Sequence, residues 1–287
     1  MFRLYQRVLP LCQARAKLYY GAQGVYFPET MTIFGTYGNG DYGWNREGHQ
    51  SSEVLNMWWR YAWQQGLELV TLMQDYYGYT GDQHFLKEEL LPMADQVLRY
   101  YDSRFPRGPD GKLVISPTQS VETYWYGVTN DMPSVAGLHA VLERLLALPP
   151  ARTSAAERQF WLRMQAATPG LPMHSEAGQR WLLAAERFEP KRSNVENPEL
   201  YAVWPYRLFG LGKPDLQAAI QAFDRRGEKG MKGWSYDGQC AAILGLTEEA
   251  KEQILSKAAN SNPRCRFPAM WGPNFDWLPD QDHGSNI

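Results

Sequence analysis

Residues 76–102 read YYGYTGDQHFLKEELLPMADQVLRYYD, and this stretch decides the fold class. Its residues 79–82 (YTGD) carry the glycine and aspartate that are typical of a turn. After the turn, apolar side chains recur three or four positions apart over about 83–104, which predicts a helix. The apolar positions are Leu86, Leu90, Ala94, Val97 and Tyr101. An apolar helical pattern also precedes the turn, so the stretch predicts an antiparallel helical hairpin.

We expect the first helix of this hairpin to cover 51–78, with Ser51 or Ser52 as its N-cap. Its apolar stripe is wide, which indicates burial on more than one side. The stripe comprises Leu55, Trp58, Trp59, Ala62, Trp63, Leu69, Val70, Met73 and Tyr76. Similar patterns predict further helices over about 1–20, 134–148, 153–167, 214–228, 236–245 and 247–260, and a short helix associated with the segment 194–214. Pro10 should kink the first of these or mark a late start, and Gly21 should end it. A short β-like run at 113–115 and a short strand pair around 180–188 complete the expected elements.

About nine helices, many of them paired by short turns, predict an all-α protein. No fixed period of roughly 33–47 residues is visible, so a helical solenoid is disfavoured. A closed barrel of helical hairpins fits better, because irregular loops then converge at one end and build a pocket. We expect residues 1–287 to form a single domain of this kind.

Composition narrows the classes of partner. The 287 residues are 44% hydrophobic and 21% charged, as in a folded protein with a sizeable core. The net charge of −2, without any basic block, argues against nucleic acid and against an anionic membrane surface. No run of 18 apolar residues is present, so we expect no membrane span. The three cysteines are far apart and suggest neither a metal knuckle nor a disulfide framework. We expect no metal and no cofactor.

Aromatic residues make up 14% of the chain, with 11 Trp and 17 Tyr. Such side chains pack cores, and they also stack against the apolar faces of sugar rings. Composition alone does not choose between these uses.

Glu122 lies in SPTQSVETYWYG (116–127), beside three aromatic residues. A carboxyl group in a partly apolar pocket has a raised pKa and stays protonated, as a general acid requires. The alternative interpretation is a solvated or backbone-capping glutamate in a loop. Both interpretations fit the residues themselves.

The C-terminal stretch DWLPDQDHG (276–284) carries Asp276, Asp280, Asp282 and His283. Several acids close together in an aromatic loop could act as a base that holds a water molecule, or could bind a cation. The spacing resembles a calcium loop only faintly, because the later ligands are absent. A lone histidine such as His283 is more often a satisfied hydrogen-bonding residue than a catalyst.

Two earlier segments are also candidates. In NVENPELYAVWPY (194–206), Glu196 and Glu199 flank a proline at a predicted helix start, where acids interact favourably with the helix dipole. The glycine-rich loop 21–50 carries Glu29 and Trp44 among other aromatic and polar residues. That mixture suits sugar recognition, and it equally suits a long loop packed under itself.

Five motifs together resemble the catalytic domain of glycoside hydrolase family 95 and its uncharacterised relatives. In order they are FPETMTIFG (27–35), the stretch 76–102 quoted above, DGKLVISPTQSVETY (110–124), GWSYDGQCAAILGL (233–246) and FDWLPDQDHGSN (275–286). The most specific pieces are Y-x-Y-T-G-D-x-x-F-L and S-P-x-x-S-x-E. The resemblance runs over nearly the whole chain and implies an (α/α)6 barrel. It also implies an inverting glycosidase, in a family that contains α-L-fucosidases and α-L-galactosidases.

The resemblance assigns roles to single residues. Glu122 matches the glutamate that is the general acid of the family, and Asp282 matches the aspartate that polarises the water-activating asparagine. Apart from the resemblance, the chemistry of aromatic rings suggests that Trp44, Trp125, Trp271 or Trp277 could stack on the apolar face of the sugar. The remaining expected substrate-binding residues are Glu29, Glu196, Asp276 and His283.

The chain also departs from the family pattern. Its last motif reads Asp-His-Gly instead of Asp-Gly-Asn, and NVENPELYAVWPY replaces the usual histidine-rich segment. These differences predict a divergent branch that acts on a different sugar. The paired asparagines of the family lie upstream of the residues present, so we expect an incomplete barrel that is part of a longer protein.

Two function classes follow. The main expectation is a glycosidase with a carbohydrate substrate; the resemblance allows a secreted or periplasmic parent protein, although the first 21 residues carry no secretory signal. The alternative is a catalytically incomplete carbohydrate-binding or scaffold fragment. A sugar lyase or epimerase would share the fold, but no Tyr or His base beside a carboxylate-binding Arg is recognisable.

Overall fold

The computed structural model describes residues 1–36, 47–50, 53–229 and 235–259. Within them, the helix α5 (Met132–Leu146) lies at the centre and is buried on nearly every side. A helix that is apolar all round has to be enclosed by other elements. Here α2 (Gln65–Thr80), α6 (Ala155–Ala167) and the short 3-10 helix η4 (Pro198–Ala202) pack against it.

The start of α5 is held by a fully buried aspartate. Asp131 is the N-cap of α5, and its Oδ2 accepts a hydrogen bond of 2.9 Å from the backbone N–H of Ser134. Its Oδ1 accepts a bond of 2.6 Å from the Thr118 hydroxyl, in the loop that precedes Glu122. Burial raises the pKa of Asp131 to about 6, and these hydrogen bonds oppose the rise. One side chain therefore ties the loop to the central helix.

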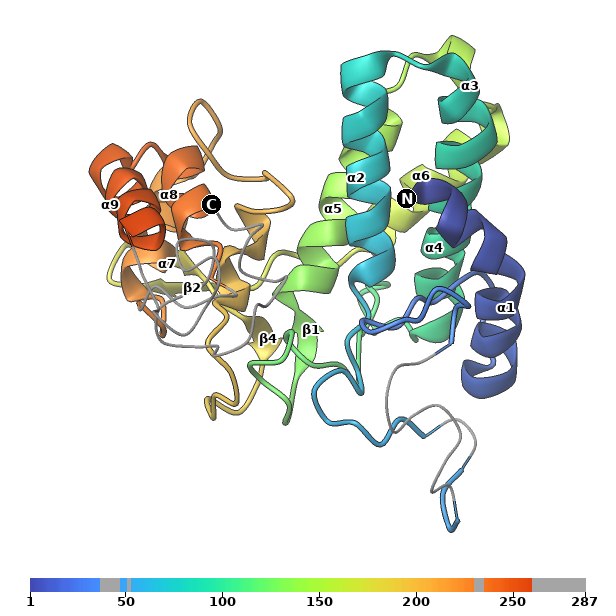
Figure 1. Cartoon of the computed structure of the whole chain (residues 1–287), viewed down its shortest axis with the longest axis horizontal. Helices are drawn as coiled ribbons and strands as arrows, with labels where there is room; N and C mark the ends of the chain where they lie inside the picture. Colours follow the sequence, from blue (N-terminus) through green and yellow to red (C-terminus); the bar gives the residue numbers. More distant parts are fainter. Residues whose placement is uncertain (37–46, 51–52, 230–234, 260–287) are drawn as a thin grey trace.

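The predicted helical hairpin is confirmed. Helix α2 ends at Thr80, and α3 (Gln83–Phe85), the π-helical turn η2 (Leu86–Leu90) and α4 (Leu91–Arg104) follow as one continuous helical run. Gly81 takes the left-handed conformation, with φ of 64°, that a helix C-cap favours. Asp82 caps the second arm by accepting from the N–H groups of His84 and Phe85. Figure 1 shows the two arms side by side.

The expectation that α2 begins near residue 51 is wrong, because the helix starts at Gln65. Residues 57–61 form turns instead, and their polar groups bond to the loop around Gln119. The Gln119 side chain accepts from the N–H of Tyr61 at 2.7 Å and donates to the carbonyl of Trp58. The Trp63 indole N–H donates to the carbonyl of Pro117 at 2.9 Å. Trp59 and Trp63 are buried as their pattern predicts, but distant partners replace the helical bonds.

Helix α1 (Phe2–Tyr20) packs against α4. It runs through Pro10 from the second residue, so the expected late start is wrong. Gly21 ends it in the left-handed region at φ of 61°, as predicted.

Four short strands occur in the described part of the chain, as two separate antiparallel pairs. β2 (Met173–Glu176) pairs with β3 (Gln179–Leu182), and β1 (Thr129–Asp131) pairs with β4 (Ala185–Arg187). Strands are present in the expected range 180–188, as β3 and β4. They do not pair with each other, because β3 pairs with β2 and β4 pairs with β1. The run at 113–115 makes only an isolated bridge, between Leu113 and Arg107.

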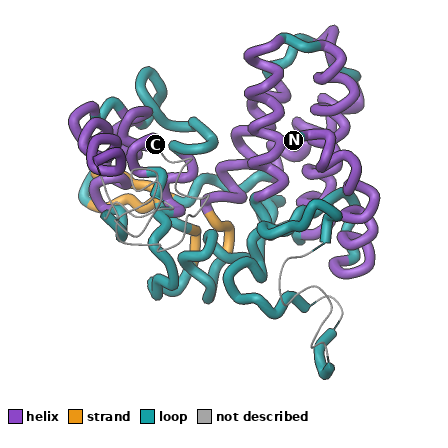
Figure 2. Tube along the Cα trace, viewed as in Figure 1, coloured by secondary structure: helices purple, strands orange, loops and turns teal. Residues whose placement is uncertain are grey.

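A second group of helices follows η3 (Pro150–Arg152) and the strands. It contains α7 (Leu216–Arg225), α8 (Asp237–Leu244) and α9 (Thr247–Ala259), which Figure 1 shows apart from α1–α6. The helix η4 contacts both α5 and α7 and so joins the two groups. Figure 2 shows that helices dominate, in agreement with the expected helical class. Across the described residues, no helix is both long and apolar enough to span a membrane.

The contact of α5 with its neighbours gives a stability prediction. A Cβ added at Gly137 would lie 2.7 Å from the Tyr206 hydroxyl oxygen and 2.9 Å from Cβ of Leu67. Gly137→Ala should therefore destabilise the protein by about 1–3 kcal/mol, the usual cost of overpacking. The matched control is Gly78→Ala on α2, where nothing lies within 4 Å and alanine should stabilise by about 0.5–1 kcal/mol. Urea unfolding of both variants measures the difference; equal stabilities would contradict this packing.

Candidate functional site

A pocket of about 540 Å³ opens between the start of α1, the loop after α1 and the first turns of α2. Loop residues around Glu122 and Glu196 form its opposite wall, together with Tyr201 and Tyr236. The other lining residues are Met1, Leu4, Tyr5, Phe27, Pro28, Glu29, Thr30, Met31, Thr32, Ile33, Gln64, Gln65, Glu68, Leu69, Leu72 and Val121. The pocket therefore collects segments that are distant in the sequence.

Four carboxyl groups line this pocket, and each comes from a different segment. Glu29 belongs to the loop after α1, Glu68 to the first turn of α2, and Glu122 and Glu196 to two further loops. No lysine, arginine or histidine side chain occurs among the described residues that line it. Such a pocket disfavours anions and suits neutral groups rich in hydroxyls.

Glu122 is positioned by a strained and well-bonded loop. The residue before it, Val121, has φ of 46°, a conformation that β-branched side chains rarely adopt. Strain of this kind persists only where the surroundings impose it, and it is common at functional sites. Asn194 Nδ2 donates a bond of 2.6 Å to Glu122 Oε2, and the Trp125 indole N–H donates one of 2.7 Å to the Glu122 carbonyl. The half-buried carboxyl of Glu122 is thereby fixed in orientation.

Glu196 lies directly against Glu122. Its Oε2 accepts a hydrogen bond of 3.1 Å from the backbone N–H of Glu122. Its backbone carbonyl accepts from the Thr123 hydroxyl at 3.1 Å and from Arg192 Nη2 at 2.6 Å. Burial, followed by repulsion from Glu122, raises the pKa of the Glu196 carboxyl to about 8.

The other two carboxyl groups respond to the same surroundings. Burial raises the pKa of Glu68 to about 7. For Glu29, burial and then the charges of Glu196, Glu122 and Glu68 raise the pKa well above its usual value. Glu29 keeps part of its surface in contact with water at the pocket, and its Oε2 accepts a hydrogen bond of 3.3 Å from Gln65 Nε2. Near neutral pH, part of the cluster is therefore protonated and can donate as well as accept hydrogen bonds.

The structure brings together three of the residues that the sequence singled out: Glu29, Glu122 and Glu196. Trp125 lies next to them but outside the lining, with its ring packed edge-on against Trp58 at a centroid distance of 4.9 Å. The remaining candidates lie outside the described residues and stay predictions. They are Trp44, Trp271, Asp276, Trp277, Asp280, Asp282 and His283.

Sequence reasoning missed Glu68, Asn194 and the three pocket tyrosines, Tyr5, Tyr201 and Tyr236. Glu68 had a signal, since it is an acid inside the apolar helical run GLELVTLM (66–73). Asn194 opens the motif that also contains Glu196, but nothing local indicates that it bonds to Glu122. Glu199 is buried in the first turn of η4, where the helix-dipole interpretation placed it. Within the described ranges, no group of three His, Cys, Asp or Glu residues is arranged to hold a metal ion.

The raised pKa of Glu196 predicts how stability depends on pH. The unfolded chain releases this proton near the ordinary value of 4.5, and the folded protein only at about 8. Between these values the folded state holds more protons, so its stability falls as the pH rises. Glu196→Gln removes this loss. The melting temperature of the variant minus that of wild type should therefore increase by at least about 2 °C from pH 5 to pH 9.

The matched control is Glu143→Gln, which changes an exposed glutamate of α5 outside the pocket. This variant shows how replacing a glutamate by glutamine changes stability away from the pocket. Thermal unfolding at several pH values checks both variants. A constant difference between Glu196→Gln and wild type would contradict the raised pKa.

Comparisons with known proteins concern the family and the fold of the chain. The sequence profile described as the glycosyl hydrolase family 95 catalytic domain matches residues 1–274, which confirms the resemblance drawn from the motifs. None of the curated proteins matches the chain in sequence. A solved structure described as a kojibiose phosphorylase from the human microbiome is similar with a TM-score of 0.61 and 11% identity. That similarity covers 87% of this chain and 36% of the other, and it concerns the fold, which is of the helical α/α-toroid type.

Proposed function

Because the chain belongs to the family of glycosyl hydrolase family 95 catalytic domains, we propose that its pocket cleaves a terminal glycosidic bond by acid–base catalysis, with Glu122 as the proton donor. The pocket has room for a sugar residue, and its walls carry the polar groups that bind hydroxyls. The placement of Glu122 supports this proposal most strongly. Its carboxyl is half-buried, held by Asn194 and directed into the same pocket as three further glutamates.

In the proposed reaction, the Glu122 carboxyl gives its proton to the departing glycosidic oxygen as the bond to the anomeric carbon breaks. Water attacks that carbon from the opposite face and loses a proton to a base. An inverting enzyme needs about 6.5–9.5 Å between acid and base to admit this water. Asp282 remains the proposed residue that polarises the base, as the family resemblance implies.

The charge of the pocket favours hydrolysis over phosphorolysis. A phosphate ion as the attacking group is usually held by cationic side chains, which balance its negative charge. The described lining residues offer four carboxyl groups and no basic side chain. We therefore propose water as the nucleophile, although the structural relative is described as a phosphorylase.

The proposed substrate is a terminal α-L-fucosyl, α-L-galactosyl or related neutral sugar. The protonated members of the glutamate cluster suit its hydroxyl groups, since a neutral carboxyl both donates and accepts. We propose that the pocket lies in a complete or partial (α/α)6 barrel. The chain spans 36% of the length of the structural relative, so the activity of a longer parent protein belongs to the same proposal.

Glu122→Gln tests the proposed proton donor. Proton donation matters most for a leaving group that departs poorly on its own. The value of kcat/KM should fall by about 10²–10⁴-fold for a phenyl or alkyl glycoside, and by less than about 10-fold for a 2,4-dinitrophenyl glycoside. Hydrolysis of matched α-L-fucosides and α-L-galactosides measures both values, and NMR of the first-formed anomer tests inversion.

The matched control is Glu29→Gln, at the other side of the same glutamate cluster. A residue that only binds the sugar should lose similar activity for every leaving group. A Glu122→Gln loss that is equally independent of the leaving group would overturn the proposed role. Wild-type protein that binds these sugars without hydrolysing them would favour the carbohydrate-binding alternative.

A further inference from the structure

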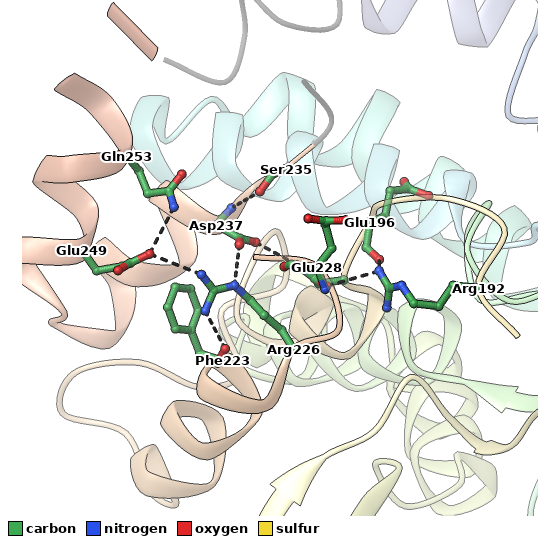
Figure 3. Close-up of polar contacts among 10 residues, drawn as sticks. Arg192, Glu196, Phe223, Arg226, Glu228, Ser235, Asp237, Glu249 and Gln253 are labelled. Carbon is green, nitrogen blue, oxygen red and sulfur yellow. Dashed lines mark hydrogen bonds and ion pairs between the residues drawn. The ribbon is translucent and has the colours of Figure 1, made fainter. Parts of the chain in front are cut away.

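A buried group of charges lies behind the pocket, between α7, α8 and α9. Arg226 is 6% exposed and Asp237 is 2% exposed. Arg226 Nε donates a bond of 2.5 Å to Asp237 Oδ2, and Arg226 Nη2 lies 3.3 Å from Glu249 Oε1. Figure 3 shows the guanidinium between these two carboxylates and over the ring of Phe223. The ion pair thus joins the end of α7 to the starts of α8 and α9.

Stability alone is a weak reason for this arrangement. Removing two charges from water costs several kcal/mol per ion, and apolar pairs of similar volume are often as stable. A buried ion pair can instead favour one arrangement of the surrounding elements over others. The further contacts of Asp237 indicate which elements this pair arranges.

Asn197 connects the ion pair to the pocket. The second oxygen of Asp237, Oδ1, accepts a bond of 3.1 Å from Asn197 Nδ2. The Asn197 amide also bonds both backbone groups of Glu228, at 2.8 Å and 3.1 Å. Asn197 occupies the N-cap position of η4, but its side chain makes no capping bond. Its amide bonds to Asp237 and Glu228 instead, and its Oδ1 also accepts a longer bond of 3.4 Å from Arg192 Nη2.

Two pocket residues adjoin this link directly. Glu196 precedes Asn197 in the chain, and its carboxylate accepts from the N–H of Glu122. Tyr236 precedes Asp237 and lines the same pocket. Asp237 is the first residue of α8 and is buried. Its bond to Asn197 therefore fixes the neighbouring Glu196 and Tyr236 relative to each other.

We infer that Arg226 and Asp237 are positioning residues, which act through Asn197 to hold Glu196 against Glu122 and to fix Tyr236 in the pocket wall. This inference rests on the proposed function for its catalytic consequence. Small displacements of groups around a reacting bond cost up to about 10²-fold in rate. Loss of the link should therefore lower kcat by about 10- to 100-fold, while KM changes less.

Two variants break the link at different points. Asn197→Ala removes the amide and leaves the ion pair intact. The paired change Arg226→Met with Asp237→Leu removes both charges together, so that neither is left buried alone. If both act through one chain of contacts, the variant that combines them should be no worse than either. Independent structural damage would multiply the two losses.

The control removes an ion pair outside the pocket. Asp75 of α2 and Arg144 of α5 are 2.7 Å apart, and neither lines the pocket. Arg144→Met with Asp75→Leu should leave kcat within about threefold of wild type, whatever it does to stability.

A measurement without substrate keeps the inference testable if the proposed function fails. The ¹³C signal of the Glu196 carboxyl, assigned with Glu196→Gln, should titrate near pH 8 in wild type. Charged and hydrogen-bonding groups influence the Glu196 carboxyl or contact its residue. They are Glu122, Glu68, Glu29, Thr123 and Arg192. If Glu196 leaves Glu122 in the link variants, its midpoint should fall by at least about one pH unit.

The outcomes separate the two claims. Wild-type protein without hydrolytic activity would refute the proposed function, and the titration would still decide the positioning role. An unchanged Glu196 midpoint in both link variants would overturn the inference. So would losses in kcat that multiply in the combined variant.

Discussion

The enclosure of α5 is the constraint on which the pocket depends. Its N-cap Asp131 holds Thr118 and so anchors the loop that presents Glu122. Its middle meets α2 at Gly137 and Leu67, one residue before Glu68. Another face packs against η4, which follows Glu196 directly. Three of the four pocket glutamates are therefore placed by contacts with a single buried helix, whose apolar surface has to be covered on every side.

The chemistry of the pocket follows from crowding these acids together. In water each glutamate ionises near its ordinary pKa, but burial and mutual repulsion raise the pKa of Glu68 to about 7 and of Glu196 to about 8. The protein loses stability as the pH rises from about 4.5 to about 8, and in return its carboxyl groups stay protonated near neutrality. A strained Val121 and the Asn194 bond hold Glu122 among them, and strain at a functional site has to be balanced by contacts elsewhere.

The two helical groups have different parts in this arrangement. The group α1–α6 builds the core and supplies Glu29 and Glu68 directly. Among the described residues, the group α7–α9 contributes Tyr236, the N-cap residue of α8, to the pocket. Its buried Arg226 and Asp237 connect through Asn197 to Glu196. Polar bonds at the junction of the two groups set the position of one pocket wall more narrowly than apolar packing alone would, because hydrogen bonds are directional.

The sequence by itself determined the helical class, the hairpin around Gly81 and Asp82, and the family, because apolar periodicity, turn residues and local motifs are short-range features. It also selected Glu29, Glu122 and Glu196. Only the tertiary structure decided that residues 57–61 form turns, since their partner Gln119 lies far along the chain. Only the fold brought Glu68 and Asn194 to Glu122 and joined Asp237 to Asn197. Contacts between residues 40 to 72 positions apart depend on how helices pack, and no local pattern records that packing.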